Sequence, residues 1–194
     1  MNVKRTLTDR ASAVPALAEA FREHGFEGAS LAILSQATGL GKGSLYNFFP
    51  GGKEEMMDAV LADIDGWFYA TIFAPLEQPR DPATAIRSMI EEVTAYFRSG
   101  GRVCLVGLIG LGSSGGAFAS RVKDYFARWI SALVHCLEAG DVPPSQAQSL
   151  AEETVCGIQG AIILSRALGE ETAFGRIIGR HEAVLLNAVA RHSR

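Results

Sequence analysis

The sequence predicts an all-α protein, with a small three-helix domain over residues 1–52 and a larger helical domain over residues 53–194. Three observations predict this fold. Apolar residues recur at helical spacing along most of the chain, strand-like alternation is scarce, and Gly or Pro clusters separate the helical stretches. With 48% hydrophobic and 20% charged residues, the chain can bury an apolar core and is not of disordered composition.

The first expected helix begins near Ser12 and ends at His24-Gly25, because glycine is typical of a helix C-terminus. Pro15 clashes with the preceding turn when it lies in a helix interior, so we expect it in the first turn. The apolar stripe of this segment consists of Leu7, Val14, Leu17, Ala18 and Phe21.

Residues 28–53 are predicted to hold two short helices joined by a tight turn. Ser30 is a suitable N-cap for a helix over 31–38, residues 38–41 supply the turn, and a second helix follows over 42–48. Polar and basic side chains on a short second helix are the features with which a helix-turn-helix motif reads a DNA duplex. The residues expected at the DNA are Ser30, Gly41, Lys42, Ser44, Tyr46, Asn47 and Lys53, while Leu31, Leu34, Leu45, Phe48 and Phe49 are expected to form the core.

The larger domain is predicted to consist of long helices separated by breaks that contain proline or glycine. Pro75, Pro79 and Pro82 indicate one loop, and residues 113–116 indicate a flexible break. The expected helices cover residues 53–74, 82–99, 117–139, 145–168 and 172–191, with an apolar, glycine-containing segment at 103–112.

The net charge of −3 is unevenly distributed along the chain. Residues 1–53 contain six Lys or Arg and four Asp or Glu, whereas residues 54–194 contain twelve and seventeen. A small basic module on an acidic body can still bind DNA, because phosphate contacts are local and are screened beyond about 10 Å.

Composition also indicates the compartment. The N-terminus lacks the apolar core of a signal peptide, and no uncharged apolar run reaches the roughly 18 residues of a membrane helix. We therefore expect a cytoplasmic protein with no membrane partner. Cys104, Cys136 and Cys156 are odd in number and lack metal-binding spacing, so we expect free thiols.

Two glycine-rich motifs resemble nucleotide-binding loops, and both are incomplete. In GLGKGS, residues 39–44, Gly43 stands where a phosphate loop needs Ser or Thr, and Gln36 stands where its first glycine belongs. GLGSSG, residues 110–115, matches a dinucleotide pattern but lacks an acidic residue about 20 positions later. The four histidines have no neighbours that indicate a triad or a metal site. We expect no catalytic residues, no cofactor and no metal.

Residues 21–61, FREHGFEGASLAILSQATGLGKGSLYNFFPGGKEEMMDAVL, resemble the N-terminal domain of the TetR family of bacterial repressors. The resemblance rests on the turn glycines, the KGSLY helix, the aromatic pair and the lysine that opens the next helix. The C-terminal segments CLVGLIGLGSSG, FASRVKDYFARWI and GIQGAIILSRAL are similar to the ligand domain of the LmrA/YxaF-like branch.

This resemblance implies a homodimer with an effector pocket in the larger domain. The helices at 145–168 and 172–191 have more apolar surface than a monomer needs, so we expect them to form the dimer interface. Trp129 could stack on a flat ligand, and Gln159 is a polar group in an apolar helix that needs a partner. The expected ligand-binding residues are Trp67, Phe68, Met89, Phe97, Cys104, Phe118, Phe126, Trp129 and Gln159.

The expected function is sequence-specific transcriptional repression, with release from a pseudo-palindromic operator by a small hydrophobic or aromatic effector. The alternative from another class is a helical small-molecule-binding protein or enzyme without a DNA-binding role. An activator, or a repressor that takes no ligand, would have a similar sequence.

Overall fold

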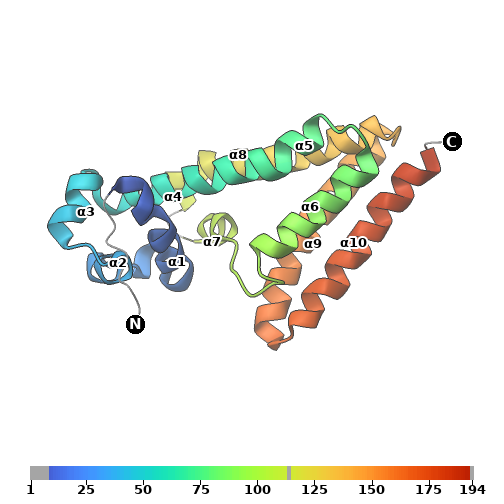
Figure 1. Ribbon diagram of the computed structural model, residues 1–194. Coiled ribbons are helices and arrows are strands. Elements are labelled where there is room, and N and C mark those ends of the chain that lie inside the picture. The colour runs from blue at the N-terminus through green and yellow to red at the C-terminus, as the bar shows by residue number, and fades with distance from the viewer. Residues whose placement is uncertain (1–8, 113–114, 193–194) are drawn as a thin grey trace. The chain divides into compact units, whose positions relative to one another are not determined.

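The computed structural model describes residues 9–112 and 115–192, and every regular element in these ranges is a helix (Figure 1), which confirms the predicted fold class. Contacts divide the chain into two compact units. Unit 1 comprises Met1–Asp65 and Leu105–Val122, and unit 2 comprises Gly66–Cys104 and Lys123–Arg194. The predicted boundary at residues 52 and 53 therefore falls inside unit 1, which also takes in a segment from the middle of the chain.

Helix α1 spans Arg10–Gly28 and begins earlier than predicted. Asp9 is its N-cap, and a capping box links Asp9 and Ser12 by reciprocal hydrogen bonds. This cap places Pro15 at the sixth helical residue, so the expectation that Pro15 lies in the first turn is wrong. Gly25 interrupts the helix with φ +68°, close to the predicted end.

The two short helices have the predicted bounds: α2 spans Leu31–Thr38 and α3 spans Lys42–Phe48. The Ser30 hydroxyl accepts a hydrogen bond from the Ile33 N–H, and Gly39 adopts φ +69°, the left-handed conformation that the turn requires. Of the predicted core residues, Leu34, Leu45 and Phe49 are fully buried, whereas Leu31 and Phe48 are half-buried.

The next helical run continues further than predicted. Helix α4 spans Gly52–Phe68, the π-helical turn η1 spans Tyr69–Phe73, and α5 spans Ala74–Glu77. Pro75 was expected to lie in a loop after the helix. It lies instead at the start of α5, next to the π-turn, where the chain departs from regular α-helical hydrogen bonding.

The run Gly52–Glu77 is long and apolar enough, by length and composition, to cross a membrane, although a single such helix is weak evidence. This run contains charged residues, whereas the sequence prediction concerns uncharged apolar runs. Met56, Met57 and Phe68 on this run are fully buried among protein side chains, as in the core helix of a globular protein.

Unit 2 is built largely from α6 (Pro82–Tyr96), α9 (Pro144–Leu168) and α10 (Glu171–His192), and α7 (Leu105–Leu111) belongs to unit 1. Helix α8 spans Gly115–Ala139 and contributes to both units. Helices α9 and α10 lie side by side, and α10 also packs on α6 (Figure 1). The predicted break at 113–116 is only partly described, because residues 113–114 lie outside the described ranges.

Helix α6 ends three residues before its predicted end at residue 99, because the chain enters a left-handed turn. Arg98, Ser99 and Gly100 have φ values of +49°, +52° and +90°. A Cβ atom on Gly100 would lie 2.8 Å from the Ser165 Cβ and 3.0 Å from the Phe174 Cβ. Glycine at this position therefore serves both the backbone conformation and the close packing of the turn on α9 and α10.

We predict that Gly100→Ala lowers the free energy of unfolding by about 2–3 kcal/mol, because it adds strain at positive φ and overpacks the contact with α9. Urea unfolding followed by circular dichroism measures this loss. Gly66→Ala in α4 is the control, because no atom lies within 4 Å of its added Cβ; it should stabilise the helix by up to about 1 kcal/mol. Equal stability of the two variants would contradict the packing argument.

Candidate nucleic-acid interface

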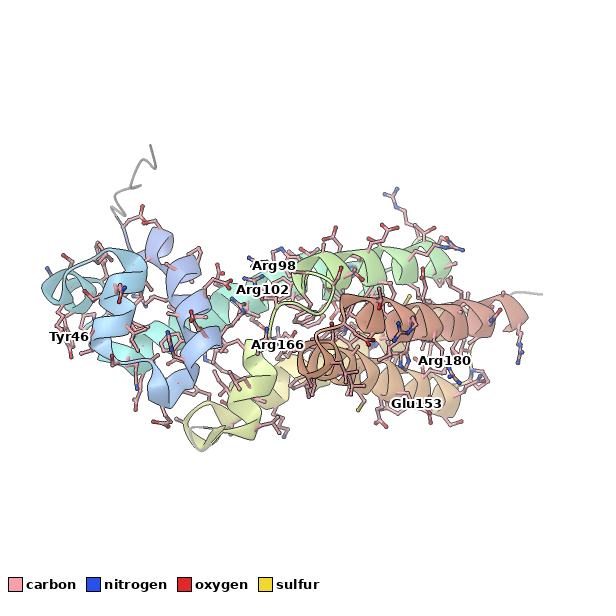
Figure 2. The ribbon with its side chains drawn as sticks, turned by 90° about the horizontal axis from the view of Figure 1, so that it is seen from below. Tyr46, Arg98, Arg102, Glu153, Arg166 and Arg180 are labelled. Carbon is pink, nitrogen blue, oxygen red and sulfur yellow. The ribbon has the colours of Figure 1, made fainter. Side chains whose placement is uncertain are left out.

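Helix α3 and the turn before it form an exposed polar surface on unit 1. Gly41 is the N-cap of α3, and Lys42, Tyr46 and Asn47 are exposed. Ser44 is half-buried. Tyr46 is 46% exposed and lies at the surface of unit 1 (Figure 2). A Cβ atom on Gly52 would lie 3.7 Å from the Tyr46 Cε1, so one edge of this ring lies close to the start of α4.

Ser30 adds a hydroxyl at the N-terminus of α2. It is exposed, and its oxygen caps the helix by accepting from the Ile33 N–H. The hydroxyl hydrogen stays available to an external acceptor, and the helix N-terminus adds partial positive charge. Helices α2 and α3 pack on each other, so Ser30 belongs to the same two-helix motif as the exposed residues of α3.

Lys53 lies at the start of α4, as predicted, and its ammonium contacts the end of α1. Its ammonium donates hydrogen bonds to the Phe26 carbonyl at 2.9 Å and the Glu27 carbonyl at 3.4 Å, and it lies 4.6 Å from the centre of the Phe26 ring. These contacts join the end of α1 to the start of α4. A lysine has three N–H donors, so one donor remains for a further contact.

Four of the candidate ligand residues belong to an aromatic cluster of unit 2 that has Phe68 at its centre. The Phe68 ring contacts those of Trp67, Phe97 and Trp129 at centroid distances of 5.1, 6.3 and 5.3 Å. Sequence analysis missed three other members of the cluster, Phe73, Tyr96 and Tyr125. Their helical spacing was the available signal: Tyr96 lies three positions after buried Val93 on α6, whereas Phe73 lies in the π-turn, outside a regular α-helical stripe.

The other candidate ligand residues are not all part of this cluster. Met89 and Cys104 are buried in unit 2, and Phe126 is half-buried beside Tyr125. Phe118 is in unit 1, where its ring meets Phe26 edge-on at 5.2 Å. The structure therefore separates Phe118 from the aromatic cluster.

Two buried nitrogen atoms of unit 2 have no hydrogen-bond partner among the described residues. They are the Trp129 Nε1, on a side chain with no exposed surface, and the Gln159 Nε2. Burial of an N–H without an acceptor is unfavourable, so an acceptor supplied by a ligand would be stabilising at either atom. A groove of about 190 Å³ lies elsewhere in unit 2, between α9 and α10, and is lined by Gln146, Leu150, Val184, Asn187, Ala188 and Arg191.

No set of side chains in the described part of the chain indicates catalysis. No group of three or more His, Cys, Asp or Glu residues there could hold a metal ion. Burial raises the pKa of the Cys136 thiol to about 12, with the charge of Asp81 adding to the effect. This thiol is therefore protonated near neutral pH and is a poor nucleophile.

The two short helices α2 and α3, joined by a tight turn with polar and basic side chains exposed on α3, have the layout of a helix-turn-helix motif, the motif of a class of DNA-binding transcriptional regulators. The model of bacterial regulatory proteins of the TetR family matches residues 15–60, and the model of the LmrA/YxaF-like regulator C-terminal domain matches residues 82–180. The chain belongs to the TetR family. It is a transcriptional regulator and not an enzyme, so the alternative of a protein without a DNA-binding role is wrong.

The chain is 26% identical to the HTH-type transcriptional regulator LmrA of Bacillus subtilis over 75% of this chain and 79% of the relative. An HTH-type regulator of Mycobacterium tuberculosis is 23% identical over 89% of this chain and 92% of the relative. Among solved structures, a TetR regulator from Legionella pneumophila superposes with a TM-score of 0.75 at 18% identity, covering 95% of this chain and 99% of that chain. The TetR-family regulator CifR, solved with 26-base-pair operator DNA, superposes with a TM-score of 0.70 at 24% identity, covering 94% and 96%.

We predict that Lys53→Met lowers the free energy of unfolding by about 1–3 kcal/mol, because it removes the charge-assisted hydrogen bonds to α1 while keeping the apolar stem. Thermal and urea unfolding measure the change. Lys42→Met, on an exposed lysine of the same unit, is the control and should change stability by less than about 0.5 kcal/mol. A Lys53 variant as stable as the control would show that the contacts with α1 contribute little.

Proposed function

We propose that this TetR-family regulator is a repressor that binds a pseudo-palindromic operator as a homodimer and leaves it when a small hydrophobic or aromatic effector binds. The single observation that carries the proposal is the exposed polar surface of α2 and α3. Lys42, Tyr46 and Asn47 are exposed on a helix whose buried side is anchored by Leu45, as direct reading of a major groove requires. We place the protein in the cytoplasm, where its DNA would be.

Roles at the DNA follow from side-chain chemistry. Lys42 and the Ser30 hydroxyl suit phosphate oxygens, and Asn47 suits a base edge that offers both a donor and an acceptor. Tyr46 can contact sugar or phosphate through its hydroxyl. Gly41 lets the backbone approach the duplex closely, and Ser44 and the third donor of Lys53 complete the expected contacts. The complex of CifR with operator DNA supports this use of the fold.

Dimerisation is supported by apolar side chains that unit 2 leaves exposed. Ile163 and Leu168 are 59% and 62% exposed on α9, and Leu164 and Val184 are also exposed on α9 and α10. Exposed apolar groups gathered on one helix pair indicate an interaction surface. A second copy is the proposed partner, because one short recognition helix reads few bases. Two recognition helices about 34 Å apart, one from each copy, match successive turns of the duplex.

Effector binding is supported by the aromatic cluster and its unpartnered donors. A ligand that presents an acceptor to the Trp129 Nε1 or the Gln159 Nε2 would give a buried N–H group the hydrogen bond that it lacks. Because Phe68, Phe73 and Trp129 are already fully packed, a ligand that reaches Trp129 must displace an aromatic ring. Such a ligand weakens DNA binding only if it binds the DNA-free conformation more tightly than the DNA-bound one. The difference in binding free energy between the two conformations is typically about 1–3 kcal/mol.

Selection of bound duplexes from a random DNA pool, followed by a screen for compounds that release the selected duplex, tests the whole proposal. Enrichment of a two-fold-symmetric sequence and its release by an aromatic compound are the expected results. If no sequence is enriched at low ionic strength, the operator proposal fails. If a duplex is selected but no compound releases it, the effector proposal fails alone.

We predict that Tyr46→Ala and Lys42→Ala each weaken operator binding by about tenfold, because each removes a contact from the exposed surface. Fluorescence anisotropy with a labelled operator measures the affinity. Tyr69→Ala and Lys123→Ala are matched controls in unit 2: Tyr69 is 49% exposed, close to the 46% of Tyr46, and Lys123 is exposed. Weakening of the same size in the controls would remove α3 from the interface.

We predict that Leu164→Asp converts the dimer to monomers at micromolar concentration, because it places a charge on the proposed apolar interface. Analytical ultracentrifugation measures the association state. Leu111→Asp is the control, since Leu111 is 85% exposed in unit 1. Dissociation by both variants, or by neither, would argue against α9 and α10 as the interface.

A further inference from the structure

The turn that follows α6 gathers three arginines in unit 2. Arg98 and Arg102 belong to the turn itself, and Arg166 reaches it from α9 by donating a hydrogen bond from Nη1 to the Gly101 carbonyl at 2.9 Å. Figure 2 shows the three labelled arginines gathered at this turn, whereas Arg180 and Glu153 lie elsewhere on α9 and α10. We call Arg98, Arg102 and Arg166 the arginine cluster.

Two members of the arginine cluster have unused hydrogen-bonding capacity. Arg98 and Arg166 are exposed, and neither forms an ion pair with a described carboxylate. Arg166 uses one of its five N–H donors on Gly101. Arg102 lies behind them, with its guanidinium 4.6 Å from the centre of the Tyr96 ring and its Nη1 3.4 Å from the Tyr96 carbonyl.

The backbone of the turn holds the cluster in a fixed and costly conformation. Arg98 and Ser99 are non-glycine residues with φ of +49° and +52°, a left-handed conformation that is unfavourable for residues with a Cβ atom. The turn is closed by hydrogen bonds from the Gly101 N–H to the Arg98 carbonyl and from the Arg102 N–H to the Phe97 carbonyl. Strain of this kind persists where surrounding structure enforces it, and it is concentrated at binding sites. Here the close packing of Gly100 on Ser165 and Phe174 enforces it.

The chemistry of the cluster selects an oxyanion. A guanidinium group presents a planar fork of donors that matches a carboxylate or a phosphate. A small molecule suits the site better than a nucleic acid, because the cluster is confined to one turn and residues 54–194 as a whole carry a net negative charge. Residues 54–194 contain twelve basic and seventeen acidic residues, a balance that disfavours a polyanion and leaves a local site for a single anionic group.

We propose that Arg98 and Arg166, with Arg102 behind them, bind the carboxylate or phosphate group of a small organic molecule, and that this molecule is the effector. The second half of this statement rests on the proposed function, whereas the binding site itself does not. The effector would then be an organic acid with an aromatic or apolar body, held by its anionic group at the arginine cluster.

Isothermal titration calorimetry on the full-length protein without DNA, at constant ionic strength, tests the site. The probes are benzoate, phenyl phosphate and benzamide, the last being an uncharged analogue of benzoate. We expect at least one anion to bind about tenfold or more tighter than benzamide, and the double variant Arg98→Asn/Arg166→Gln to lose about tenfold or more of that affinity. The tighter of the two anions identifies the group as carboxylate or phosphate.

Matched variants distinguish a loss of anion binding from a loss of the fold. Asparagine tolerates positive φ better than most residues, so Arg98→Asn is expected to keep the turn, which circular dichroism checks. Arg80→Gln removes an exposed charge of unit 2 outside the cluster and should leave binding unchanged. Arg98→Lys keeps the charge without the fork and should retain part of the affinity.

The outcomes separate this proposal from the proposed function. No anion binding above benzamide, or equal binding by the protein and the folded double variant, would overturn the site. If an anion binds but the operator complex stays intact, the binding site is supported. The proposal that the bound molecule is the effector is then overturned. If the double variant weakens operator binding with no acid present, the arginines contact DNA phosphates and the small-molecule proposal fails, while the proposed repressor role stands.

Discussion

The seven residues of α3 are too few to form a stable helix in water. The exposed polar surface of α2 and α3 therefore depends on contacts that hold α3 against the rest of unit 1. Leu34, Leu45 and Phe49 supply the apolar part of these contacts, because each is fully buried. Lys53 supplies the polar part by tying the end of α1 to the start of α4. Any ordered arrangement of the exposed side chains of α3 follows from this support, which lies on the side away from solvent.

Unit 2 depends on a comparable core centred on a single ring. Phe68 contacts six aromatic side chains of the cluster, and pairs of this geometry add about 0.5–1.5 kcal/mol each beyond burial. The same packing surrounds the Trp129 indole with hydrocarbon and leaves its N–H without an acceptor among the described residues. The cluster is therefore stable as a hydrophobic core and imperfect as a polar environment.

Local signals allowed the sequence to predict much of the fold, including the bounds of the two helices that carry the proposed DNA contacts. Ser30, Gly39 and Gly41 delimit α2 and α3 within a few residues of themselves, so those bounds were predicted correctly. Interactions between distant residues could not be read in this way. Lys53 bonds to a carbonyl 27 positions away, and Phe118 packs on Phe26 rather than in the aromatic cluster. Pro75 failed as a helix terminator because the π-turn before it is set by packing rather than by a local sequence pattern.

That π-turn determines which side chains the last part of the long helical run can bury. Phe68, Ile72 and Leu76 are fully or almost fully buried and lie four residues apart. In a regular α-helix each four-residue step overshoots a full rotation by about 40°, so such a series would wind away from its core. The wider turn at Tyr69–Phe73 absorbs this overshoot and keeps the three side chains on one face. The helix thus carries an inserted residue as a phase correction: without that residue Leu76 would lie seven positions after Phe68 in a regular α-helix, within about 20° of the same face, and the π-turn keeps it there with eight.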